Sequence, residues 1–308
     1  MRIPGALTNL TVKSLYVSVG IDTMIRIARM VLPDFDIYKS SGFRESIPIP
    51  PQDCAATIVR IISQEDKYLA LIEALIQVDQ DGIMGRKYPV SNLRDLIKGL
   101  VQNGFTYDPV NNLFLEDGKQ RKTQGWGRLR EGQDYNLSFL RMDIVHNSKI
   151  VRDHPQEHLE QAFSQLRSLV ANKVEKRLGR IWTWEGDGGV AAFFYGHRQY
   201  LGTLAAMDIL HGMVLLNRLN NPLKVPISLR LAIHTGTVKY SSDPSIWKKN
   251  DVIKQVIEQE AKYTPKDALT VSRQTESALD RSFAALLTPL KTPDGTPLFS
   301  YKLGWETP

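Results

Sequence analysis

Cysteine is almost absent from this chain of 308 residues, and Cys54 is the only one. A single thiol excludes an intrachain disulfide and a cysteine metal cluster, and it fits a reducing compartment. A run of about 20 apolar residues is also missing, because the apolar stretch Met207–Leu216 carries Asp208 and His211. The first five residues lack a charged head followed by an apolar stretch, so we expect no signal peptide. These absences favour a cytoplasmic protein without a membrane partner.

Neither sign of charge is in large excess. Lys and Arg number 39 and Asp and Glu number 33, which gives a net charge of +6, and 42% of the residues are hydrophobic. This composition is ordinary for a globular protein and excludes a disordered chain or a coiled-coil rod. Residues 1–120 contain 13 basic and 14 acidic side chains, which leaves 26 and 19 for residues 121–308. Because the excess is mild, we do not expect nucleic acid to be a partner.

The length is typical of two domains. Residues 1–118 have helical apolar spacing in several segments, followed by two short alternating runs within residues 105–115 that indicate a hairpin. The predicted helices cover residues 21–32, a stretch from about residue 52, residues 65–78 and residues 91–103. Helices followed by a hairpin predict a mostly α, winged-helix-like domain. Its slightly acidic charge favours a regulatory or interaction role over DNA binding.

A polar linker is predicted at residues 119–136. Five basic residues and three glycines lie within residues 119–132, a composition typical of an exposed connector. The alternative is a segment that docks a partner or nucleic acid, and it depends on Trp126 standing among basic residues.

Residues 137–308 alternate between strand and helix patterns. The segments predict an α+β sandwich with helices on one side of a largely antiparallel sheet. The predicted strands are 137–145, 180–184, 190–195, 226–234 and 268–272, and the predicted helices are 155–176, 198–219, 251–263 and 274–287, with two short runs at the end.

Two carboxylates in this half stand out. Asp143 lies inside an apolar strand, just before a loop and a helix, and a buried carboxylate is costly unless it is paired or bound to a cation. Asp187 lies between two strands, with Gly186 and Gly188 beside it. Two carboxylates at adjacent strand ends could hold Mg²⁺, which prefers oxygen ligands and keeps substrate phosphates beside it. A plain hairpin turn also explains Gly-Asp-Gly.

A third segment, Ile233-His234-Thr235-Gly236, follows these two in order. The three segments together resemble the catalytic domain of the class III nucleotidyl cyclases, over roughly residues 137–308. The resemblance implies a ferredoxin-like α/β sandwich. It does not extend to residues 1–118.

The resemblance implies conversion of a nucleoside triphosphate into a 3′,5′-cyclic nucleotide and pyrophosphate, as part of cyclic-nucleotide signalling. Two ions, Mg²⁺ or Mn²⁺, would be held by Asp143, Asp187 and the carbonyl of Ile144. Substrate would lie against the loop residues His146, Asn147 and Ser148, and against Thr183 and Gly186. The active sites of this family form between two protomers, so a head-to-tail homodimer is implied.

Several positions depart from the family's pattern. Thr183 stands where purine cyclases usually carry a base-reading Lys, so the base can be that of ATP, GTP, CTP or UTP. The family's Asn and Arg, four residues apart on a helix, have no counterpart here. Their positions fall on Lys254 or Gln255 and on Glu258 or Gln259, depending on the register.

Two functions therefore remain open. The first is an active cyclase with an altered base choice, for example a pyrimidine triphosphate, in which Lys254 or Lys262 supplies positive charge to the transferring phosphoryl group. A solvated helix face of alternating charge explains these lysines equally well. The second is a catalytically silent module that binds a nucleotide or only dimerises. Trp182 and Trp184 line a base pocket or a dimer contact in the first case, and plain hairpin packing explains them as well.

Overall fold

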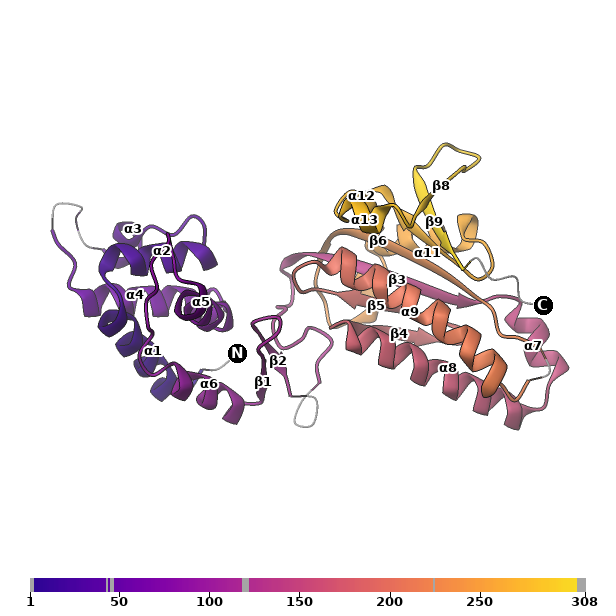
Figure 1. The fold of residues 1–308 in the computed structure, drawn as a ribbon, viewed down its shortest axis with the longest axis horizontal. Coiled ribbons are helices and arrows are strands. Elements are labelled where there is room, and N and C mark those ends of the chain that lie inside the picture. Colours follow the sequence, from indigo (N-terminus) through magenta and orange to yellow (C-terminus); the bar gives the residue numbers. More distant parts are fainter. Residues whose placement is uncertain (1–2, 43, 45–46, 118–121, 224, 304–308) are drawn as a thin grey trace. The chain divides into compact units, whose positions relative to one another are not determined.

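The computed structural model describes residues 3–42, 44, 47–117, 122–223 and 225–303 (Figure 1). The chain divides into two compact units, Met1–Arg128 and Leu129–Pro308. The first unit is mostly helical and the second combines helices with a mixed sheet, so the expected α+β class is confirmed.

The first unit is a cluster of helices around one apolar core. Side chains such as Leu15, Ile27, Ile58 and Ile72 are fully buried in it. Helix α2 stops at Val31 because Leu32 precedes Pro33, and the residue before a proline avoids the helical region. The described elements are α1 (Gly5–Ser18), α2 (Ile21–Val31), α3 (Ile37–Ser41), α4 (Pro51–Gln64), α5 (Tyr68–Asp81), α6 (Leu93–Gln102), β1 (Phe105–Asp108) and β2 (Leu113–Glu116).

The β1–β2 hairpin is confirmed, with Phe105 paired to Glu116 in an antiparallel register. The segment after it differs from the expected exposed connector, because Trp126 is only 1% exposed. The buried carboxylate of Glu116 accepts the backbone N–H of Thr123 at 2.9 Å and so holds this segment. Residues 122–128 consequently belong to the first unit.

The second unit is built on seven strands. Its elements are β3 (Asp134–Ile144), α7 (Asn147–Asp153), α8 (Gln156–Lys176), β4 (Arg180–Glu185), β5 (Gly188–Phe193), α9 (Arg198–Leu219), β6 (Leu229–Lys239), α10 (Pro244–Trp247), α11 (Asp251–Tyr263), β7 (Ala268–Ser272), α12 (Arg273–Glu276), α13 (Arg281–Ala284), β8 (Thr288–Leu290) and β9 (Leu298–Lys302). The strands lie in the order β4-β5-β3-β6-β7-β9-β8, and only the β6–β7 pairing is parallel.

Helices cover both faces of this sheet, which corrects the expectation that they lie on one side. Leu140, Met142 and Ile233 belong to the apolar core shared with α8 and α9. On the opposite face α11 packs so closely that a Cβ on Gly236 would lie 2.6 Å from Val252. The face that carries Asp143 therefore has a helix above part of it.

The single helix expected over residues 274–287 is two short helices. Residues 277–280 separate α12 from α13, and the Asp280 carboxylate caps α13 by accepting the N–H of Phe283 at 2.9 Å. An aspartate at this position starts a new helix, because its side chain satisfies a free N–H of the first turn.

Among the described residues, one helix, α9, is long and apolar enough to cross a membrane. Ala205, Ile209 and Met213 of α9 are buried in the core of the second unit. A core helix passes the same length and composition test, and 56% of the apolar window of α9 is buried.

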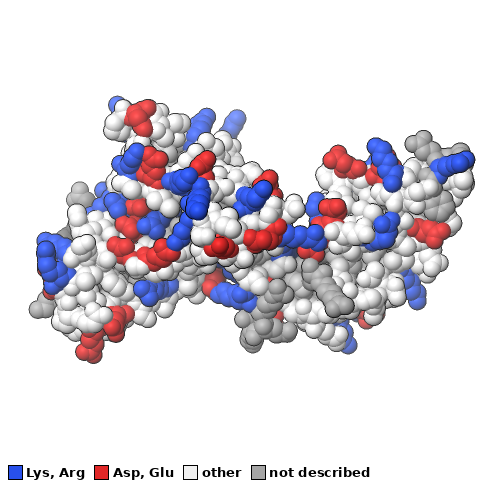
Figure 2. All heavy atoms as spheres, turned by 180° about the vertical axis from the view of Figure 1, so that it is seen from behind, with Lys and Arg blue, Asp and Glu red and all other residues white. Residues whose placement is uncertain are grey.

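Charge is mixed over the surface that Figure 2 shows, where basic and acidic side chains are interspersed on each unit. The excess of positive charge is therefore not gathered on that face.

Candidate active site

Asp143 lies at the end of β3, on the sheet face opposite the core of α8 and α9. Its neighbours Met142 and Ile144 are buried in that core, and side chains alternate along a strand. In the register, Asp143 pairs with Gly188 of β5 on one side and with Arg230 of β6 on the other. The carboxylate side chain is 15% exposed.

Asp187 lies in the turn that joins β4 to β5. Gly186 has a φ of +59°, which a glycine adopts without strain. A Cβ on Gly188 would lie 2.6 Å from the carbonyl oxygen of Met142, so only glycine lets β5 approach β3 here. Because Asp143 pairs with Gly188, the turn brings Asp187 to the same end of the sheet as Asp143.

Two arginines, which the sequence analysis did not single out, hold Asp143. Arg141 donates to Asp143 Oδ1 at 3.1 Å, and Arg230 donates to Oδ2 at 2.7 Å. The sequence does carry a signal for them, because each is a charged residue within an otherwise apolar strand. Arg141 is two residues before Asp143, on the same strand face, and Arg230 is the second residue of a mostly buried strand.

Glu260 of α11 completes this group. Its side chain is 3% exposed and lies 2.7 Å from Arg230 Nε and 3.6 Å from Arg141 Nε. The pKa of Glu260 is raised, mainly by burial and also by the charge of Asp143, and the two arginines offset only part of this shift. We call Arg141, Asp143, Arg230 and Glu260 the arginine–carboxylate network.

Two carboxylates and a backbone carbonyl are hard oxygen donors. Mg²⁺ and Mn²⁺ accept such donors, and water and substrate phosphates complete the coordination shell. The donor chemistry of Asp143, Asp187 and Ile144 therefore fits a divalent cation. Within the described residues no group of three or more His, Cys, Asp or Glu side chains is arranged to hold a metal ion.

The three residues expected to contact phosphate follow β3 at the start of α7. His146 has a φ of +55° and lies at the N-terminal end of α7, in which Asn147 and Ser148 are the first residues. His146 and Ser148 are exposed, and Asn147 is half-buried. The structure thus places all three directly after the strand that carries Asp143.

The β4 residues expected near the base contact different parts of the second unit. Thr183 donates to Glu185 at 3.3 Å, and Glu185 forms an ion pair with Lys248. The pairing of β4 with β5 shifts register between Ile181 and Thr183, so Trp182 and Trp184 do not share the same neighbours although they are two residues apart. Trp182 packs against Phe139, Tyr240 and Trp247, whereas Trp184 packs against the core on the α8 side.

The α11 positions that correspond to the family's Asn and Arg do other things. Gln259 is buried and donates to the carbonyl oxygens of Thr270 at 3.0 Å and Ile233 at 3.3 Å, so it joins α11 to the sheet. Lys254 is exposed and paired with Asp251 at 3.0 Å. Gln255 and Gln259 border a hollow of about 310 Å³ together with His234, Tyr263 and Asp294.

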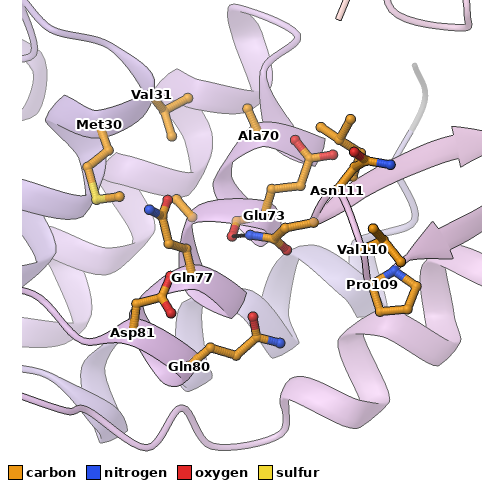
Figure 3. A pocket seen from close by; sticks show the side chains of 13 residues that line it. Met30, Val31, Ala70, Glu73, Gln77, Gln80, Asp81, Pro109, Val110 and Asn111 are labelled. Atoms are coloured by element: carbon orange, nitrogen blue, oxygen red, sulfur yellow. Dashed lines mark hydrogen bonds between the residues drawn. The ribbon is translucent and has the colours of Figure 1, made fainter. Parts of the chain in front are cut away.

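A second hollow lies in the first unit, between α2, α5 and the β1–β2 turn (Figure 3). It measures about 510 Å³ and is open to solvent. Glu73 and Asp81 line it together with the amide side chains of Gln77, Gln80 and Asn111. None of the residues predicted for the active site lies there.

Searches against protein families and against curated proteins found no match. Solved structures are similar to a little over half of the chain. The guanylate cyclase domain from Catenaria anguillulae in complex with GTP is 13% identical, with 55% of this chain and 96% of that chain covered and a TM-score of 0.47. An adenylate/guanylate cyclase/hydrolase from Silicibacter pomeroyi is 17% identical, with 56% and 98% covered and a TM-score of 0.46. The adenylyl cyclase CyaB from P. aeruginosa is 14% identical, with 57% and 96% covered and a TM-score of 0.47.

All three are described as nucleotide cyclases. Their identities lie below 20% and their TM-scores below 0.5.

Proposed function

We propose that residues 129–308 bind a nucleoside triphosphate with divalent cations and convert it into a 3′,5′-cyclic nucleotide and pyrophosphate. The observation that carries this proposal is the pairing of Asp143 with Gly188, which brings Asp143 and Asp187 to one end of neighbouring strands. A single half-buried carboxylate needs only an ion pair, whereas two of them at one strand end suit a cation and its phosphate ligands.

The residues of this chain have distinct roles in the proposal. Asp143, Asp187 and the carbonyl of Ile144 hold the cations. When bound, these ions favour ionisation of the ribose 3′-hydroxyl and neutralise the β- and γ-phosphates. His146, Asn147 and Ser148 position the phosphates through their backbone N–H groups. Thr183 and Gly186 contact the substrate at the β4–β5 turn.

Positive charge for the leaving pyrophosphate can also come from another copy of the chain. Gln259 is occupied within its own domain, whereas Lys254 is 60% exposed. We therefore propose a head-to-tail homodimer in which Lys254 of one protomer serves the site of the other. A role in cyclic-nucleotide signalling and a cytoplasmic location are parts of the same proposal.

The base is the open part of the proposal. Thr183 carries no charge and can both donate and accept a hydrogen bond, so it suits a carbonyl or an amino group on a base equally. All four triphosphates are therefore candidate substrates.

A product assay tests the proposal. We would incubate the full chain with Mn²⁺ or Mg²⁺ and each of ATP, GTP, CTP and UTP, and identify cyclic products by mass spectrometry. Asp187→Asn replaces one charged cation ligand by a much weaker neutral amide, and Asp153→Asn, at the exposed end of α7, is the matched control. We expect a cyclic product from wild type and from Asp153→Asn, and none from Asp187→Asn.

Two results would count against an active cyclase. The first is a product that persists in Asp187→Asn, because it would come from another activity. The second is the absence of product from a folded dimer that still binds a triphosphate in equilibrium dialysis. That second result identifies the domain as a silent nucleotide-binding module.

A further inference from the structure

The arginine–carboxylate network engages both oxygens of a carboxylate that the proposed function needs for a cation. Arg141 takes Oδ1 of Asp143 and Arg230 takes Oδ2. A divalent cation and a guanidinium compete for the same oxygen lone pairs. A cation can therefore bind Asp143 only if at least one arginine moves or shares its oxygen.

Glu260 gives the two arginines a second anchor that does not depend on Asp143. It comes from α11, reaches both guanidinium groups and is almost fully buried. Two arginines and two carboxylates make the network neutral. When a cation takes over Asp143, the network is left with two guanidinium groups and only one carboxylate.

Arg141 lies at the turn that carries Asp187. A Cβ on Gly188 would lie 2.7 Å from its guanidinium, so Gly188 leaves the space that this group occupies. A guanidinium released from Asp143 here is therefore next to the β4–β5 turn, at which Gly186 is expected to contact the substrate. Guanidinium groups bind phosphate oxygens with two parallel hydrogen bonds.

We infer that Arg141 and Arg230 are positioning residues that hold Asp143 in the absence of substrate and turn to the triphosphate when a cation binds. This inference rests on the proposed function. It has a measurable consequence, because cation and triphosphate then bind cooperatively. The cation frees the arginines and the triphosphate supplies their new anionic partner, so each strengthens the binding of the other by the same factor.

Metal binding by the full chain tests this inference without any turnover. We would titrate Mn²⁺ in equilibrium dialysis and measure the excess of manganese on the protein side of the membrane, with and without inorganic tripolyphosphate, a probe that carries no base. For wild type we expect weak binding of Mn²⁺ alone and binding tightened on the order of tenfold by tripolyphosphate.

Variants separate the arginines from the rest of the domain. Arg141→Gln and Arg230→Gln should each bind Mn²⁺ alone about tenfold more tightly than wild type, since one competitor for Asp143 is gone. They should also lose most of the tightening by tripolyphosphate. The matched control is Arg177→Gln, which removes an arginine paired with Asp208 at 2.8 Å elsewhere in the same unit, and it should behave as wild type.

Loss of folding in a single variant would obscure this readout, because Glu260 would keep a buried charge. The double variant Arg141→Gln/Glu260→Gln removes one charge of each sign, and it should show the same tighter binding of Mn²⁺ alone. Circular dichroism checks that each variant is folded.

Two outcomes overturn the inference, and they can be told apart. If wild type binds Mn²⁺, Asp187→Asn does not, and both arginine variants bind Mn²⁺ no more tightly than wild type, then the arginines do not compete for Asp143. If wild type binds no Mn²⁺ with or without tripolyphosphate, the cation site itself is absent and the proposed function fails with it.

Discussion

Two arginine–carboxylate centres, one in each unit, use the same chemistry in different surroundings. In the first unit, Glu73 accepts the backbone N–H of Phe114 at 2.7 Å and forms an ion pair with Arg128, which also donates to the carbonyl of Phe114. These contacts join α5 to β2 and to Arg128, the last residue of the unit. In the second unit, the partners of Asp143 are two side chains beside a glycine turn.

The two centres differ in whether the carboxylate can exchange its hydrogen-bonding partners for others. The backbone N–H of Phe114 is fixed in a hairpin, and Arg128 is itself held by the Phe114 carbonyl, so Glu73 has a fixed structural role in the first unit. Side-chain guanidinium groups can move to another anion, so Asp143 can be released. Substitutions at the two centres should therefore affect different measurements.

The largest effect is expected on activity. Asp143→Asn should lower the rate of cyclisation on the order of a thousandfold, because the neutral amide is a much weaker ligand for a cation. Glu73→Gln should leave the rate within about twofold of wild type. The assay is formation of cyclic product per mole of folded chain, and equal losses in the two variants would remove the distinction between the centres.

The next effect concerns the stability of the first unit. Glu73→Gln should lower its free energy of unfolding by about 2 kcal/mol, because a charged acceptor for Arg128 and for a backbone N–H is lost. The buried thiol of Cys54 reports on this unit, since burial raises its pKa to about 11 and the folded protein should resist thiol reagents.

Thiol modification as a function of urea concentration measures this change. Glu65→Gln, at the exposed C-terminal end of α4, is the control and should shift the midpoint little. If the urea midpoint of Glu73→Gln equals that of wild type, Glu73 does not stabilise the first unit.

A smaller effect is expected from pH on the second unit. Burial lowers the pKa of His234, so the folded unit binds a proton there less readily than the unfolded chain does. Stability from the neutral ring is present above the unfolded pKa of about 6.5, and it is lost as the pH falls from there toward the folded pKa.

The measurement is urea unfolding followed by tryptophan fluorescence at pH 7.5 and pH 5.5. His234→Gln should lose less stability than wild type between these values, and His158→Gln, at an exposed site on α8, should lose as much as wild type. The opposite order would mean that His234 is protonated in the folded unit.

The smallest effect is expected for a third arginine–carboxylate pair. The side chains of Arg177 and Asp208 are 30% and 31% exposed, and solvent weakens such an ion pair. Arg177→Gln should change the free energy of unfolding by less than about 1 kcal/mol. A loss as large as that of Glu73→Gln in urea unfolding would show that exposure does not rank these pairs.

Much of this arrangement could be predicted from the sequence, because it follows local periodicity. Helix α9 has the predicted bounds, Arg198–Leu219, and the hairpin around Asp187 was expected from the glycines beside it. The helix predicted over residues 274–287 was wrong because Asp280 caps a new helix, a local signal that apolar spacing conceals.

The arginine–carboxylate network could not be predicted in this way. Arg230 meets Asp143 across 87 positions of the sequence, and Glu260 reaches both arginines only because α11 covers the second face of the sheet. Strand register and helix placement decide these contacts, and neither is visible in the spacing of residues. Trp126 was expected in an exposed connector for the same reason, since its burial depends on the fold of the first unit.

The apolar character of α9 has a consequence for synthesis of the chain on the ribosome. Its buried face packs against β3 and β5, which precede it, and against β6 and β7, which follow it. Until residue 272 has emerged from the ribosome, β7 cannot pack against α9. The nascent chain then carries a helix apolar enough to cross a membrane, with part of its apolar face exposed to solvent. This interval is when the second unit should depend most on chaperones that shield apolar segments.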